Sequence, residues 1–135
     1  MKRAATLVLI LATACSHTLT PAQRKTEFCA RSMRLRDAQR AFKNVDTHDP
    51  AALRDAIGLL LHRAEDARAF VADDVKAPFD VIVDSIKAFV DSLTKVGYDI
   101  GRLTANQTFQ TPDVQEASKL VGSYTTLLCG FAATS

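Results

Sequence analysis

The 135-residue sequence contains no tryptophan and only 5 glycines and 4 prolines. Sandwiches and barrels need many tight turns, which use glycine and proline, so the sequence favours a helical domain. Hydrophobic residues make up 47 % and charged residues 24 % of the chain, an ordinary composition for one globular domain.

Motifs that carry chemistry are also lacking. The histidines stand apart at positions 17, 48 and 62, and no His-x3-His, Cys-x2-Cys or Glu-x2-His spacing occurs, so the sequence shows no metal-ligand pattern. It has neither the Gly-x-Ser-x-Gly context of a serine nucleophile nor a glycine-rich phosphate loop. The sequence therefore predicts a protein that is not an enzyme and binds no metal or cofactor.

The first 14 residues have the pattern of an export signal. Basic residues at 2 and 3 precede a largely apolar run over 4–11, which is too short to span a bilayer. Small residues follow at 12–14, where a signal peptidase cuts. We therefore exclude residues 1–14 from the fold; a buried core helix is the alternative.

Cys15 directly follows this signal. The stretch 11–15, Leu-Ala-Thr-Ala-Cys, resembles a bacterial lipobox, although the usual leucine three positions before the cysteine is here Ala12. Lipid on Cys15 would leave Cys29 and Cys129 as one pair, so no cysteine stays unmatched. The sequence predicts an exported protein held by this lipid at the outer face of the cell membrane. Ordinary cleavage after Ala14, which releases a soluble secreted protein, is the alternative.

The positive charge of the sequence belongs to its signal. Removal of Lys2 and Arg3 reduces the 17 basic residues to 15, which balance the 15 acidic residues. Net charge is then zero, so nothing predicts nucleic-acid binding.

The stretch from Phe79 to Leu103 predicts the central helix of the domain. Its apolar residues recur in steps of three and four, the spacing of one helix face. They are Phe79, Ile82, Ile86, Phe89, Leu93, Val96, Ile100 and Leu103. A helix with one broad apolar side needs partners.

Three further helices are expected around it. The first runs from Pro21 to about Asn44, the second from Pro50 to about Val75, and the fourth from Pro112 to about Gly130. Asp49-Pro50 and Thr111-Pro112 are helix starts, and Ala77-Pro78 is expected to open the third helix. Residues 15–20 form a tether, and Phe109 in the longest connection is expected to fold back on the core.

Short connections favour antiparallel neighbours, so residues 21–135 predict an all-α, up-and-down four-helix bundle. Cys29 lies early in the first helix and Cys129 in the last turn of the fourth. This topology brings them to one end, and export permits a disulfide between them. Two free buried thiols are the alternative.

Short motifs along the domain resemble a loose family pattern: Phe28-Cys29, Ala77-Pro78-Phe79, Gly97-Tyr98-Asp99, Glu116-Ala117, Tyr124 and Cys129-Gly130. The pattern is similar to that of small, largely uncharacterised exported lipoproteins of actinobacteria, which place Phe-Cys early and Tyr-x4-Cys-Gly near the end. The resemblance covers about 26–131. It implies fold and location, but no activity or catalytic residue.

Charge is uneven along the chain. Residues 21–44 contain seven basic and two acidic side chains, a net charge of +5. Pairing with acids inside the molecule is the simpler interpretation. The functional one is contact with anionic lipid or an acidic partner, through Arg24, Lys25, Arg31 and Arg34. Carboxylates at 73, 74, 80 and 84 form an acidic corner that could bind a cation, but more simply caps a helix and faces water.

The sequence therefore favours a lipid-anchored, non-catalytic helical module that binds an envelope protein. The alternative is a carrier of an apolar ligand or haem inside the bundle. Candidate haem ligands are Met33, His62, Tyr98 and Tyr124; Met33 and Tyr124 are more simply core residues, and His62 pairs with Asp66. A closed core would favour the module, and an apolar cavity of a few hundred cubic ångströms would favour the carrier.

Overall fold

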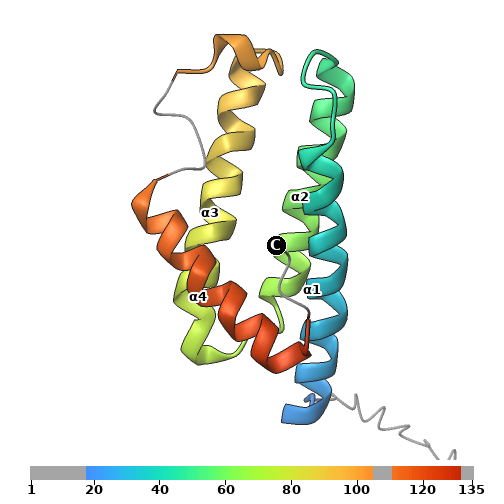
Figure 1. The fold of residues 1–135 in the computed structure, drawn as a ribbon, viewed down its shortest axis with the longest axis vertical. Coiled ribbons are helices and arrows are strands. Elements are labelled where there is room, and N and C mark those ends of the chain that lie inside the picture. The colour runs from blue at the N-terminus through green and yellow to red at the C-terminus, as the bar shows by residue number, and fades with distance from the viewer. Residues whose placement is uncertain (1–17, 105–110, 132–135) are drawn as a thin grey trace, which may run out of the picture.

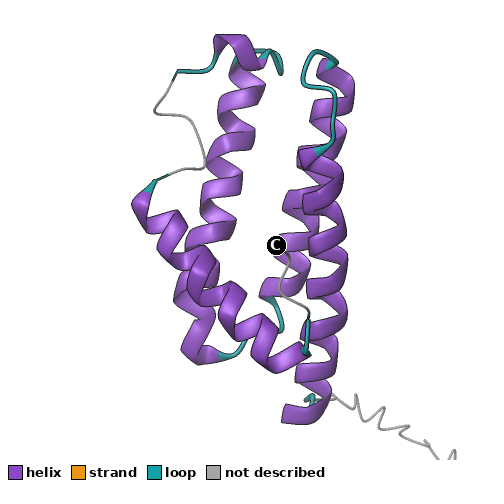
Figure 2. Ribbon diagram, viewed as in Figure 1, coloured by secondary structure: helices purple, strands orange, loops and turns teal. Residues whose placement is uncertain are grey.

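A computed structural model describes residues 18–104 and 111–131. These residues form four α-helices, one short 3-10 helix and no strand (Figures 1 and 2). The elements are α1 (Pro21–Lys43), α2 (Pro50–Arg68), α3 (Asp73–Lys95), η1 (Ile100–Arg102) and α4 (Pro112–Cys129). The predicted all-α bundle is confirmed, and its helices run up, down, up and down. Cys15 and Phe109 lie outside the described residues.

The helices do not pack equally. α1 packs most extensively on α2 and α4 on α3, whereas α1 and α4 share the smallest contact of the four main pairs. Figure 1 shows why: α4 crosses the bundle obliquely, and only its end reaches α1. The largest fully buried side chains are Phe28, Phe79, Leu53, Ile57, Leu93, Val71 and Val83.

Side chains cap the starts of the first two helices, of which the sequence predicts the cap at Asp49. Thr20 Oγ1 accepts a hydrogen bond from the amide of Gln23 at 3.2 Å, and Gln23 Oε1 accepts one from the amide of Thr20 at 2.9 Å. This reciprocal capping box opens α1. Asp49 accepts from the amides of Ala51 and Ala52 and so caps α2.

The boundary between α2 and α3 differs from the prediction. α2 ends at Arg68 instead of near Val75, and α3 begins at Asp73, so Pro78 lies inside the helix that it was expected to open. The proline falls in the second turn, where it removes a single backbone hydrogen bond. Asp73 and Asp74 hold the first turn instead, because carboxylates are favourable at the positive end of a helix dipole.

Asp80 links the end of α2 to α3 through ion pairs. It is therefore not part of a water-facing acidic corner. Lys76 Nζ donates to Asp80 Oδ2 at 3.1 Å, and Arg68 Nε donates to Oδ1 at 2.6 Å. The hydrogen bond from Lys76, followed by the contact with Arg68, holds the pKa of Asp80 below its ordinary value. The Arg68 contact joins the end of α2 to the third turn of α3.

The end of α3 also comes earlier than predicted. The helix stops at Lys95 because Gly97 and Tyr98 both take positive φ angles, of 65° and 61°. The amide of Tyr98 bonds the carbonyl of Leu93 at 2.8 Å and that of Gly97 bonds Thr94 at 3.2 Å, which is a Schellman motif. Residues 100 and 103 therefore pack on the core from η1 and its end, not from the helix face.

The central stripe of α3 is largely as predicted. Phe79, Ile86, Phe89 and Leu93 are buried, but Val83 is buried as well and Ile82 is only half-buried. A helix packed between two neighbours buries more than one row of side chains. The predicted stripe, with its strict spacing of three and four residues, includes only one of these rows and therefore leaves out Val83.

Phe89 tests the register of this stripe. It is 8 % exposed, and its ring meets the edge of Phe42 at 6.5 Å. Phe89→Ala should lower the free energy of unfolding by about 3–5 kcal/mol, because transfer energy is lost and a cavity remains. Asp91→Ala, on the exposed side of the same helix, should change it by at most about 0.5 kcal/mol. Denaturant unfolding with the disulfide intact measures both; small, similar losses would mean that the face is exposed.

Candidate functional site

The two ends of the domain meet at a covalent link. Cys29 of α1 and Cys129 of α4 form a disulfide across 100 residues, with their Cα atoms 5.5 Å apart. The predicted pairing is confirmed. Beside it, Phe28 packs edge-on against Phe79 at 6.2 Å and Tyr124 at 5.9 Å. This aromatic cluster joins α1, α3 and α4 at the disulfide end.

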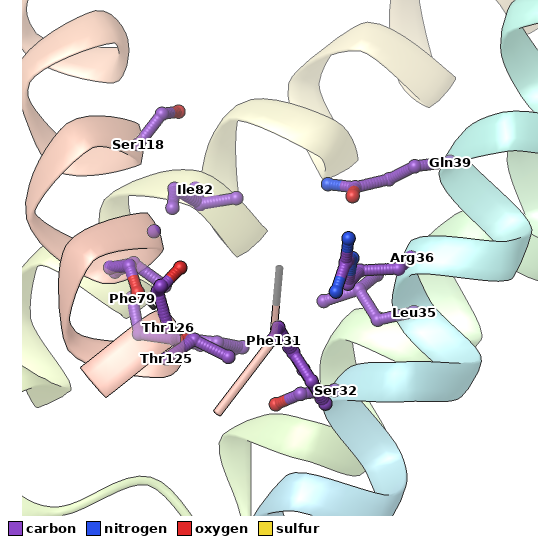
Figure 3. Close-up of a pocket in the computed structure, with 12 residues that line it drawn as sticks. Ser32, Leu35, Arg36, Gln39, Phe79, Ile82, Ser118, Thr125, Thr126 and Phe131 are labelled. Atoms are coloured by element: carbon purple, nitrogen blue, oxygen red, sulfur yellow. Dashed lines mark hydrogen bonds between the residues drawn. The ribbon is translucent and has the colours of Figure 1, made fainter. Parts of the chain in front are cut away.

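A cleft lies between α1, α3 and α4, where α4 diverges from α1 (Figure 3). It measures about 270 Å³ and opens to solvent. Its lining residues come from all three helices and from the residue that follows the C-cap of α4. They are Ser32, Leu35, Arg36, Gln39, Phe79, Ile82, Ser118, Val121, Gly122, Thr125, Thr126 and Phe131.

The cleft has an apolar floor and polar sides. Arg36 and Gln39 extend from α1 on one side, and Ser118 and Thr126 lie on the α4 side (Figure 3). The guanidinium of Arg36 stacks over the ring of Phe131, with its carbon 4.7 Å from the ring centre. The arrangement can therefore take an apolar group whose polar end meets hydroxyl, amide and guanidinium groups.

Acid–base chemistry has little support in this cleft. Among its described lining residues, Arg36 is the one ionisable side chain, and there is no carboxylate, histidine or cysteine. A guanidinium does not exchange its proton near neutral pH, so these residues include no general acid or base. The lining suits binding and not proton transfer.

The sequence does not predict the cleft directly, although one signal points to it. Phe28, Leu35 and Phe42 recur at helical spacing on one face of α1, and Ser32 and Gln39 occupy the positions between them. Ser32 is only 4 % exposed. Polar residues on an otherwise apolar stripe indicate that this face does not pack against another helix along its whole length.

The four basic residues of the predicted contact do not form one surface. Arg24 and Lys25 are exposed in the first two turns of α1. Arg31 is instead half-buried, paired with Glu27 and stacked over Phe70 with its guanidinium carbon 4.0 Å from the ring centre. Arg34 is exposed on the α1–α2 side and borders a shallow pocket with Leu59 and Arg63.

The candidate haem ligands are also dispersed. Met33 is exposed, so its assignment to the core is wrong. His62 lies 3.7 Å from Asp66, as expected, and the Tyr98 hydroxyl bonds Thr94 at 3.2 Å. Tyr124 packs in the aromatic cluster, where burial and then the charge of Asp74 raise the pKa of its hydroxyl. None of the four lines the cleft.

Residues 18–104 and 111–131 contain no group of three or more histidine, cysteine or carboxylate side chains that could hold a metal ion. None of the helices in these ranges is both long and apolar enough to cross a bilayer.

Comparison with known proteins adds no relative: no protein-family model, curated protein or solved structure matches the chain.

The disulfide gives a measurable prediction. In a Cys15→Ser background, replacing Cys29 and Cys129 together with alanine should lower the free energy of unfolding by about 4–5 kcal/mol, because the unfolded chain regains the entropy of a 100-residue loop. Denaturant unfolding measures the loss, and single replacement of Ser16 in the same background is the control. Two thiols that alkylate freely in the native, unreduced protein would refute the bond.

Proposed function

We propose that this protein is an exported, lipid-anchored protein of the cell envelope, and that it binds a partner without catalysis. The observation that carries the proposal is the open cleft between α1, α3 and α4. Its apolar floor with hydroxyl, amide and guanidinium sides suits recognition. Its described lining offers no group to transfer a proton, which supports binding over catalysis.

Two observations, one from the sequence and one from the structure, support export and anchoring. The first 14 residues have the pattern of an export signal, and a cysteine follows at once. The remaining cysteines are paired with each other, and disulfides persist mainly in oxidising compartments. A lipid on Cys15 accounts for the third cysteine and leaves the domain tethered by residues 15–20.

The preferred occupant of the cleft is an apolar side chain of an envelope protein. The cleft is neither the closed core expected of the module nor the apolar cavity expected of the carrier, because it measures about 270 Å³, opens to solvent and has polar sides. This openness gives access to a side chain on another protein's surface. Haem has less support, because none of Met33, His62, Tyr98 and Tyr124 lines the cleft. A small apolar ligand is the second candidate, since Leu35, Phe79 and Ile82 provide an apolar floor.

The anchor is tested by detergent phase separation of the protein produced in a bacterial host that attaches lipid to exported cysteines. The native chain should enter the detergent phase and Cys15→Ser should stay in the aqueous phase, because one acyl chain contributes about 0.8 kcal/mol per buried methylene. Equal recovery of both from the aqueous phase would remove the anchor from the proposal.

The cleft is tested by filling it. Gly122 lines the cleft and a Cβ there meets no atom within 4 Å, so Gly122→Leu should block the site while α4 stays folded. Gly58 on α2 has the same free space and lies outside the cleft, which makes Gly58→Leu the matched control. Both variants should unfold at the same or higher denaturant concentration than the native chain, because glycine is a poor helix former.

The readout is what copurifies with each variant from its own solubilised membrane, identified by mass spectrometry. A protein or small molecule recovered with the native chain and with Gly58→Leu should fall at least tenfold with Gly122→Leu. Equal recovery with both variants would show that the cleft is not the binding site.

A further inference from the structure

The end of the bundle that follows the proposed tether also bears the most exposed large apolar side chain of the described residues. Leu127, in the last turn of α4, is 87 % exposed. The disulfide between Cys29 and Cys129 places this turn beside the early turns of α1. A leucine exposed to this extent at a helix end has no packing role in the domain.

Basic side chains stand at the same end. Every residue from Pro21 to Thr26 is exposed, and Figure 1 shows these first turns of α1 projecting beyond the turn that joins α2 and α3. Arg24 and Lys25 therefore stand out from the bundle, and neither makes an ion pair with another described residue. Leu19, just before α1, is exposed as well.

The length of the tether brings this end to the membrane. Residues 15–20 are six residues, which reach at most about 20 Å when fully extended. A lipid on Cys15 would therefore hold the start of α1 within that distance of the lipid headgroups. Anionic headgroups attract basic side chains within about one Debye length, about 8 Å at physiological salt, and a tether of this length allows the start of α1 to come that close.

We infer that the disulfide end of the bundle rests on an anionic lipid surface, with Leu127 inserted at the interface and Arg24 and Lys25 on the headgroups. This inference rests on the lipid anchor proposed above. An exposed apolar side chain and basic side chains at one end of the bundle match the two layers of such a surface, acyl chains below and phosphates above.

The other charged groups at this end set the orientation. Asp73 and Asp74 are exposed at the start of α3, and an anionic surface repels them. Arg31 and Asp80 are engaged inside the protein with Glu27, Arg68 and Lys76. The contact is therefore made by the edge formed by α1 and α4, and the start of α3 tilts away from the lipid.

The absence of tryptophan makes this contact easy to observe, since a tryptophan introduced at one position is the only indole in the chain. Leu127→Trp reports the proposed contact. Leu120→Trp is the matched control, because Leu120 is also exposed, at 53 %, two turns earlier on the same helix. The lipidated full-length variants are placed in vesicles of phosphatidylglycerol and phosphatidylcholine that carry brominated acyl chains, which quench indoles at the interface.

Quenching of the indole at position 127 should be at least twofold stronger than at position 120. It should weaken in vesicles of phosphatidylcholine alone. The double variant with Arg24→Gln and Lys25→Gln should weaken the quenching as well. Each charge removed should lower the population of protein in contact with the lipid by about fivefold. Anchored protein with equal, weak quenching at both positions would overturn the inference.

Failure of the anchor is distinguishable from failure of the contact. If the native chain does not partition into detergent, the proposed anchor fails. The Cys15→Ser protein then still tests the contact, because it should bind phosphatidylglycerol vesicles in a salt-sensitive way that Leu127→Ser reduces and Leu120→Ser does not. Equal binding of these two serine variants would overturn the contact, whatever the fate of the anchor.

Discussion

The bond between Cys29 and Cys129 is the constraint on which the arrangement of this domain depends. It fixes the point at which α4 crosses α1. Phe28, next to Cys29 in the chain, packs with Phe79 and Tyr124 at the same place. The disulfide and the aromatic cluster thus hold α1 and α4 together at one end of the bundle. Beyond this end α4 diverges from α1, so α1 and α4 share little contact.

The divergence of α4 gives the molecule two distinct surfaces. Above the disulfide it leaves the cleft, with Arg36 and Gln39 facing the hydroxyl groups of α4. At the disulfide itself, the last turn of α4 lies beside the early turns of α1. A four-helix bundle with evenly packed helices would bury the side chains that line the cleft. Partner binding and membrane contact, as proposed, would therefore use separate surfaces and could occur together.

Helix existence, order and the disulfide followed from the sequence because periodicity, caps and topology all agreed. The boundaries of α3 did not, because local signals competed there. Pro78 indicates a helix start, but Asp73, Asp74 and the pairing of Asp80 with Arg68 extend the helix in front of it. The positive φ of Tyr98 ends the helix early, which no apolar pattern reveals.

The candidate site was less accessible to sequence reasoning than the fold. The cleft depends on the angle of α4, and Leu120 of this helix is exposed for the same reason. Ser32 and Gln39 are the only residues whose positions in the sequence point to it.

The disulfide also has a consequence for resistance to proteases: a single cut anywhere between residues 29 and 129 leaves both fragments covalently joined. A nicked molecule keeps α1 and α4 together, so it could retain its shape after damage that would dismantle an unlinked bundle.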